Sequence, residues 1–144
     1  KGGIEKLRGQ VRFSSLQYLK VKSMTRAPLA EGEECISVEL DNYVLLSPEA
    51  ISLDDDNRSK LQQVINKEPL ALIEYWAVDP DYDGQVFRSV WQDYRGNTAN
   101  DGDALRVVTK AQFNVPHKAG ERRICVRAVD VFGFEAETVQ VVQA

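Results

Sequence analysis

Several residue types and motifs that enzymes depend on are scarce or missing in this chain of 144 residues. His117 is the only histidine, and it lies in a Pro-His-Lys-Ala-Gly turn. Any Ser-His-Asp or Cys-His arrangement would have to use it, and no Gly-x-Ser-x-Gly nucleophile turn occurs. Glycine-rich phosphate loops of the Gly-x-x-x-x-Gly-Lys and Gly-x-Gly-x-x-Gly types are also missing. The sequence therefore predicts a chain without a catalytic site, and one histidine rules out a histidine-rich metal site.

Cysteine is also scarce, with two residues, Cys35 and Cys125. Successive side chains of a strand point to opposite faces. Cys35 shares its face with Glu39, and Cys125 shares its face with Arg123 and Arg127. We therefore expect both thiols to point away from the core, to stay reduced and to belong to a cytoplasmic protein.

No apolar run approaches the length of a membrane span, and the charge is divided unevenly. Residues 1–28 carry seven basic groups and one acid, whereas residues 29–144 carry 11 basic groups and 21 acids. The basic segment can attract a polyanion, or it is a solvated lead-in. We expect residues 1–15 to be a basic linker and residues 16–144 to form one domain. The missing initial methionine indicates a piece of a longer protein.

Alternating apolar and polar residues predict short strands along most of the chain. The predicted strands are Leu16–Met24, Glu34–Leu40, Leu70–Val78, Val86–Tyr94, Leu105–Phe113, Arg122–Val131 and Thr138–Val142. One short helix is expected near 53–67, with Ser52 as its cap, Asp54 to Asp56 in its first turn and Pro69 after its end. The fold class that follows is mainly β, an immunoglobulin-like antiparallel β-sandwich with that helix inserted.

Three alternating carboxylates precede a glycine in the turn after Val78. Asp79, Asp81, Asp83 and Gly84 form the first half of a calcium-binding loop, in which oxygen ligands surround a hard cation. The second half is missing, and a turn rich in Asp and Gly between two strands needs no ion. A bound Ca²⁺ at these three aspartates and an ion-free turn are both retained as hypotheses; no other cofactor is expected.

Aromatic residues gather in the second half of the sequence, and with their neighbours they form recognisable blocks. We expect Trp76 and Trp91 to belong to the core. Residues 73–84 read I-E-Y-W-A-V-D-P-D-Y-D-G, residues 91–95 read W-Q-D-Y-R, and residues 127–133 read R-A-V-D-V-F-G. Asp130 and Gly133 indicate a turn in which the aspartate binds nearby backbone amides.

These blocks resemble the C-terminal region of prokaryotic adenine-specific DNA-methyltransferases of restriction-modification systems, over residues 73–142. The sequence departs from that pattern at Pro80, where an aromatic is expected, and at Phe134, where a polar turn residue is usual. The last strands also resemble immunoglobulin-like and polycystic-kidney-disease-type domains.

The resemblance implies a non-catalytic accessory domain of a DNA-modifying or helicase-like enzyme. Its partners would be the catalytic domain of the parent protein and DNA, contacted directly or indirectly, with no membrane and no small-molecule substrate. The residues expected to contact phosphate are Arg8, Arg12, Lys20, Lys22, Arg26, Arg88 and Arg95. The alternative is an immunoglobulin-like binding module of a cell-surface protein, stabilised by calcium.

Overall fold

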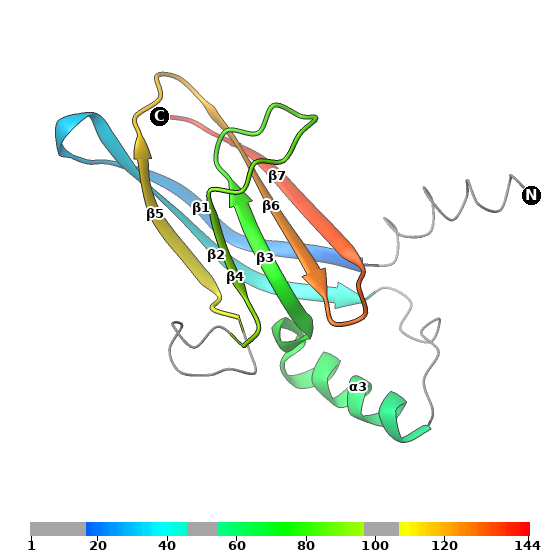
Figure 1. The fold of residues 1–144 in the computed structure, drawn as a ribbon. Helices are drawn as coiled ribbons and strands as arrows, with labels where there is room; N and C mark the ends of the chain where they lie inside the picture. Colours follow the sequence, from blue (N-terminus) through cyan, green and yellow to red (C-terminus); the bar gives the residue numbers. More distant parts are fainter. Residues whose placement is uncertain (1–16, 46–54, 97–106) are drawn as a thin grey trace, which may run out of the picture.

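The computed structural model describes residues 17–45, 55–96 and 107–144, which form two antiparallel β-sheets packed face to face (Figure 1). The strands are β1 (Gln17–Pro28), β2 (Glu33–Leu45), β3 (Ile73–Asp79), β4 (Trp91–Tyr94), β5 (Lys110–Pro116), β6 (Arg122–Asp130) and β7 (Glu135–Val142). The helical elements are η2 (Ala30–Gly32), α3 (Asp55–Lys67) and η4 (Pro69–Leu72). Residues 1–16, 46–54 and 97–106 lie outside the description, including the expected basic linker.

The strand order is β1-β2-β5 in one sheet and β4-β3-β6-β7 in the other. Seven-stranded immunoglobulin-like sandwiches place strands one, two and five in one sheet and three, six and seven in the other. Here the fourth strand pairs with β3. The predicted fold class, a mainly β sandwich with one short helix inserted, is confirmed.

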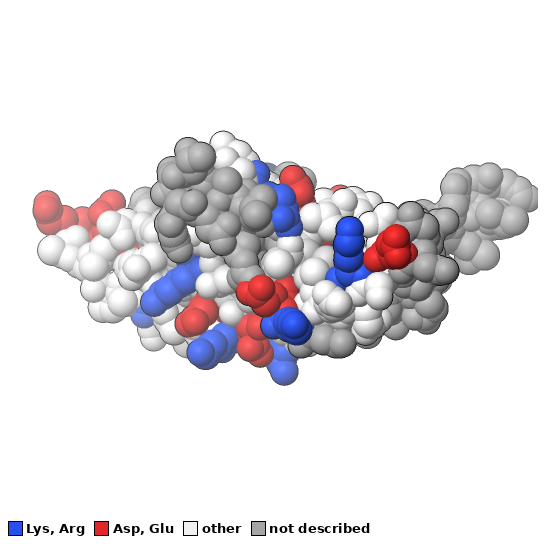
Figure 2. Space-filling model, turned by 90° about the horizontal axis from the view of Figure 1, so that it is seen from below, with Lys and Arg blue, Asp and Glu red and all other residues white. Residues whose placement is uncertain are grey.

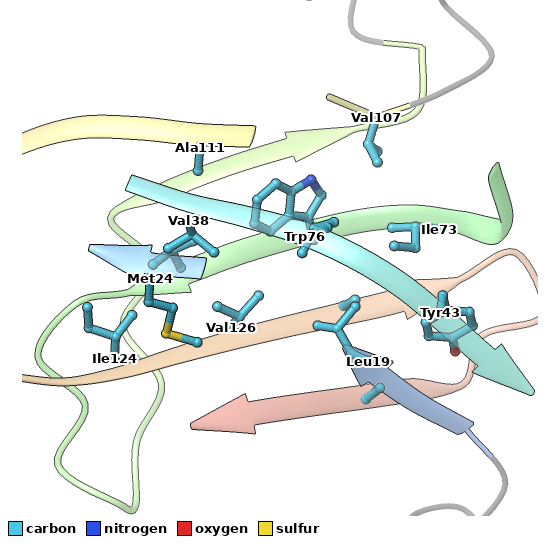
Figure 3. Packing of buried hydrophobic residues seen from close by; sticks show 14 of the residues in the cluster. Leu19, Met24, Val38, Tyr43, Ile73, Trp76, Val107, Ala111, Ile124 and Val126 are labelled. Carbon is cyan, nitrogen blue, oxygen red and sulfur yellow. The ribbon is translucent and has the colours of Figure 1, made fainter. Parts of the chain in front are cut away.

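The core forms where the inward positions of the two sheets meet. Ile36, Val38 and Leu40 alternate along β2 and are at most 4% exposed. Trp76 of β3, a strand that carries a buried tryptophan in antibody domains, is fully buried and makes an edge-on contact with Trp91, with ring centroids 4.6 Å apart. Figure 3 shows Trp76 among aliphatic side chains from both sheets. The prediction is confirmed for Trp76, whereas Trp91 is half-buried and packs against the core.

The inserted helix α3 begins and ends close to its predicted bounds of 53–67. Val64 packs against the core, and Lys67 lies in the last turn, where the negative end of the helix dipole favours a cation. Pro69 follows at the start of η4. The expected cap Ser52 lies outside the described residues. In the part of the chain that the structure describes, no helix is long and apolar enough to cross a membrane.

Three predicted strands start later than their sequence pattern suggests, and residues 70–72 of the first belong to η4. Residues 86–90 form a loop because the backbone N–H of Arg88 donates to the Asp79 carboxylate instead of to a neighbouring strand. The strand expected from Leu105 starts at Lys110. Just before it, the backbone N–H of Val108 donates to a carboxylate and its carbonyl accepts from the Trp76 indole. At both places a side-chain carboxylate accepts the hydrogen bond of a backbone N–H that would face a neighbouring strand.

A buried ion triad joins the β1–β2 hairpin to the opposite sheet. Glu34 of β2 is 2% exposed and lies between Arg26 of β1 (Nε–Oε1 3.0 Å) and Arg122 of β6 (Nε–Oε2 2.5 Å). The two guanidinium groups also donate to the carbonyls of residues 116, 118 and 120, which form the β5–β6 turn. Burial alone would raise the pKa of Glu34, but the hydrogen bonds and charges of the two arginines outweigh it and lower that pKa from 4.5 to about 2.

Glu34→Gln is expected to lower the free energy of unfolding by about 3 kcal/mol at neutral pH, because it leaves two buried guanidinium groups without their counter-ion. Since the folded-state pKa of Glu34 lies below its unfolded value, its contribution is complete above pH 4.5 and is lost as the pH falls towards about 2. Urea unfolding at several pH values measures both effects, and the variant should show a flatter acid limb.

The matched control is Glu39→Gln, which removes a carboxylate from an exposed pair with Lys22 at 3.8 Å. It should cost less than about 1 kcal/mol. Equal losses for the two variants would contradict the structural role of the triad.

Candidate interaction site

The five described basic residues that were expected to contact phosphate all lie within 3.8 Å of a carboxylate. Lys20 and Lys22 are exposed on β1, but each lies 3.8 Å from a carboxylate of β2, Asp41 and Glu39 respectively. Arg26 is a member of the buried triad, with a side chain 2% exposed. Its guanidinium donates to Glu34 and to backbone carbonyls of the β5–β6 turn, an arrangement that disfavours a phosphate contact at Arg26.

Arg88 and Arg95, which flank the aromatic strand, also bind within the domain. Arg88 is exposed and pairs with Asp83 at 3.0 Å. Arg95 is half-buried, donates to the carbonyl oxygens of Ala71 and Ile73, and lies 3.4 Å from Glu74. On the face drawn in Figure 2, basic and acidic groups are interspersed and do not gather by sign. Arg8 and Arg12 lie outside the described residues.

The loop between β3 and β4 is organised by a buried aspartate. Asp79 is 2% exposed and accepts hydrogen bonds from the backbone N–H groups of Asp81 (3.0 Å) and Arg88 (2.8 Å). The loop N–H of Tyr82 donates to the carbonyl of Arg123 on β6. One carboxylate thus holds both ends of the loop against the sheet.

The other two aspartates of the expected calcium site bind protein groups as well. Asp81 accepts from the ammonium of Lys118 at 2.5 Å. Asp83 accepts from the backbone N–H groups of Val86 and Gln85, which lower its pKa to about 2 together with Arg88. Within residues 17–45, 55–96 and 107–144, no group of three His, Cys, Asp or Glu residues is arranged to hold a metal ion. The geometry favours the ion-free turn.

Cys125 lies on β6 between two residues that contact this loop. The neighbouring outward-facing residues of β6, Arg123 and Arg127, both contact the loop, and the Arg127 guanidinium lies 4.6 Å from the Phe87 ring centroid. Cys125 therefore points away from the central core as predicted, yet it is fully buried, which the sequence did not predict. Burial first, and then the charge of Glu137, raise the pKa of its thiol to about 12, so it is a protonated, weakly nucleophilic group.

Both cysteines are free, as predicted. His117 is exposed in the turn after β5, where the sequence placed it.

Asp93 of the W-Q-D-Y-R block has a similar structural task. Asp93 of β4 is 2% exposed and accepts a hydrogen bond of 2.7 Å from the backbone N–H of Val108. The Trp76 indole donates to the carbonyl of the same residue at 2.8 Å. Two side chains of one sheet therefore fix the segment that enters β5 in the other sheet.

The turn between β6 and β7 is fixed by Asp130, as the sequence predicted. Its Oδ1 accepts from the N–H groups of Phe132 (2.9 Å) and Phe134 (3.0 Å), and its Oδ2 accepts from the hydroxyl of Tyr43 at 2.6 Å. Gly133 adopts φ 90°, a conformation that glycine reaches without strain. Burial and then the Asp130 charge raise the pKa of Tyr43 far above its usual range, so its hydroxyl remains a donor.

A hollow of about 800 Å³ opens beside this turn. Its walls are the first residues of β1, the β6–β7 turn and the start of β7, with Arg127 of β6. The aromatic and charged residues that line it are Tyr18, Phe132, Phe134, Arg127, Glu135 and Glu137. Sequence reasoning did not select this site, although Phe134, an aromatic residue at a position expected to be polar, is a signal that could have marked it.

No family model and no curated protein matches this chain. Its site is therefore interpreted from its own geometry.

Tyr43→Phe is expected to destabilise the domain by about 1–3 kcal/mol, because the buried Asp130 carboxylate loses a hydrogen-bond donor that water cannot replace. Tyr75→Phe is the matched control, since the Tyr75 hydroxyl donates to Gln92 at an exposed position. The control should change stability by less than about 0.5 kcal/mol. Equal losses of unfolding free energy in thermal or urea unfolding would show that the Tyr43–Asp130 hydrogen bond stabilises the domain no more than the exposed one does.

Adding excess calcium to EDTA-treated protein is expected to leave Tm unchanged, because Asp79, Asp81 and Asp83 already bind protein donors. A ligand that binds the native state raises Tm. A calcium-dependent rise in differential scanning fluorimetry, lost in Asp81→Asn, would establish the ion site instead.

Proposed function

We propose that this chain is a non-catalytic accessory domain of a cytoplasmic DNA-modifying enzyme, and that it acts through protein–protein packing. The class of parent enzyme comes from the resemblance of residues 73–142 to the C-terminal region of adenine-specific DNA-methyltransferases. The mode of action comes from the charges and contacts of the described residues.

The observation that carries the proposal is that key residues of the blocks resembling a methyltransferase make contacts inside the domain. Trp76 fills the core, Asp79 holds the β3–β4 loop, Asp93 and Arg95 bind backbone groups, and Asp130 closes the β6–β7 turn. Side chains committed to internal hydrogen bonds determine how loops are presented. They are poorly placed to perform chemistry on a substrate, which needs groups directed at the reacting atoms.

Packing is favoured over phosphate contact because four of the basic residues expected to bind phosphate already lie beside a carboxylate. When a protein cation neutralises a DNA phosphate, condensed counterions are released into solution, and this release favours binding. At Lys20, Lys22 and Arg88 a carboxylate already lies within 3.8 Å, and at Arg26 the guanidinium is buried. The partner that fits is the catalytic domain of the parent protein, and DNA would be approached indirectly.

The second candidate is an immunoglobulin-like binding module of a cell-surface protein. The hollow beside the β6–β7 turn favours it, because the corresponding F–G loop of antibody variable domains contributes to their binding site. Both candidates assign the domain to binding rather than catalysis.

The proposal predicts that a Lys20→Ala/Lys22→Ala double variant binds duplex DNA within about twofold of the unsubstituted chain at every salt concentration. Lys110→Ala, which removes an exposed lysine of β5, is the control for general charge loss. Fluorescence anisotropy across a salt series measures affinity and slope together. Phosphate contacts by Lys20 and Lys22 would instead make the salt dependence shallower by about one unit for each lysine, and that result would overturn the packing mode. Failure of the unsubstituted chain to bind DNA would also support the packing mode.

A further inference from the structure

Three aromatic rings face the hollow beside the β6–β7 turn. Tyr18 is 54% exposed on β1, whereas Phe132 and Phe134 flank Gly133 and are half-buried. The ring centroids of Phe132 and Phe134 are 6.4 Å apart, and the ring planes meet at 41°. Inclined rings form a corner, which suits a compact cation that contacts several ring faces. A flat base or sugar needs a planar platform.

The charged residues of the hollow leave it negative. Glu135 and Glu137 belong to β7, and Arg127 of β6 donates to Glu137 at 2.6 and 3.0 Å, so that pair is neutral. Glu135 supplies the remaining charge. A carboxylate at the rim of an aromatic corner attracts a cation and repels phosphate.

The hollow is formed before any ligand arrives. The Asp130 carboxylate fixes the backbone N–H groups of Phe132 and Phe134, and the N–H of Val131 donates to the carbonyl of Leu72 at 2.9 Å. Phe132 also packs against the core. A ligand therefore meets rings whose position is already set, which lowers the entropy lost on binding.

We propose that this hollow binds a basic segment of a partner protein, with a lysine or arginine side chain set against the rings of Tyr18, Phe132 and Phe134 and beside Glu135. The volume of about 800 Å³ lies within the range of ligand sites and exceeds what one side chain fills, which favours a peptide segment over a free amine. The inference rests on the proposed function only in taking the partner to be a protein.

The test uses the 144-residue chain and two peptides, acetyl-Gly-Arg-Gly-Arg-Gly-amide and its counterpart with citrulline in place of arginine. Citrulline keeps the shape and removes the charge. In ¹H–¹⁵N NMR titrations the arginine peptide should shift the amides of Tyr18, Phe132, Gly133 and Phe134. The citrulline peptide should bind at least about fivefold more weakly, since both the ring and carboxylate contacts need the cation.

Two variants and a control locate the binding. Phe134→Ala and Glu135→Gln should each weaken the arginine peptide by about threefold or more, whereas Tyr94→Ala, at an exposed aromatic residue of β4 outside the hollow, should leave it unchanged. The spectra report at once whether each variant is folded, and Tyr18→Ala replaces Phe134→Ala if the turn is disturbed.

Equal affinity for the two peptides would overturn the inference. So would an affinity for the arginine peptide that is unchanged by Tyr18→Ala, Phe134→Ala and Glu135→Gln. Shifts at the same amides on adding duplex DNA or a neutral oligosaccharide, in the absence of a response to the arginine peptide, would do so as well. Failure here is separable from failure of the packing mode, which is decided by the Lys20→Ala/Lys22→Ala titration with DNA.

Discussion

Four buried carboxylates constrain this domain more than any other feature of its described residues. Glu34, Asp79, Asp93 and Asp130 are at most 2% exposed, and each lies at or one residue from the end of a strand. A carboxylate removed from water is tolerated only where donors replace the lost hydration. For Glu34 the donors are two strand arginines that also bind the β5–β6 turn. For the three aspartates they include backbone N–H groups of the loop or turn that follows. The requirement to satisfy these groups therefore fixes the loops of the sandwich.

This arrangement links the recognisable blocks of the sequence to a task in the fold. The blocks that resemble a methyltransferase C-terminal region supply Asp79, Asp93 and Asp130. These aspartates hold the β3–β4 loop, the segment before β5 and the β6–β7 turn. The loop and the turn are preformed surfaces, and the proposed binding role would use them.

The strands were predictable because alternation reports which face of a strand is buried, and Asp130 was predictable because its amide partners are two and four residues away. Contacts between residues that are far apart in the sequence were not predictable. Arg26 resembles any surface arginine until the hairpin and β6 bring Glu34 and Arg122 together, and charged residues are mostly exposed. Asp93 gives no local sign that its partner is Val108, and the residues around Cys125 give no sign that its thiol is fully buried. The hollow combines β1 with β7, which are far apart in the chain.

Native-state amide hydrogen exchange tests most directly whether buried carboxylates hold the loops. The N–H groups of Asp81, Arg88, Val108, Phe132 and Phe134 lie outside the strands but donate to Asp79, Asp93 or Asp130. The account predicts that these amides exchange as slowly as those of the adjacent strands, because they open only when the sheets separate. Exchange at the rate of unprotected loop amides would contradict it.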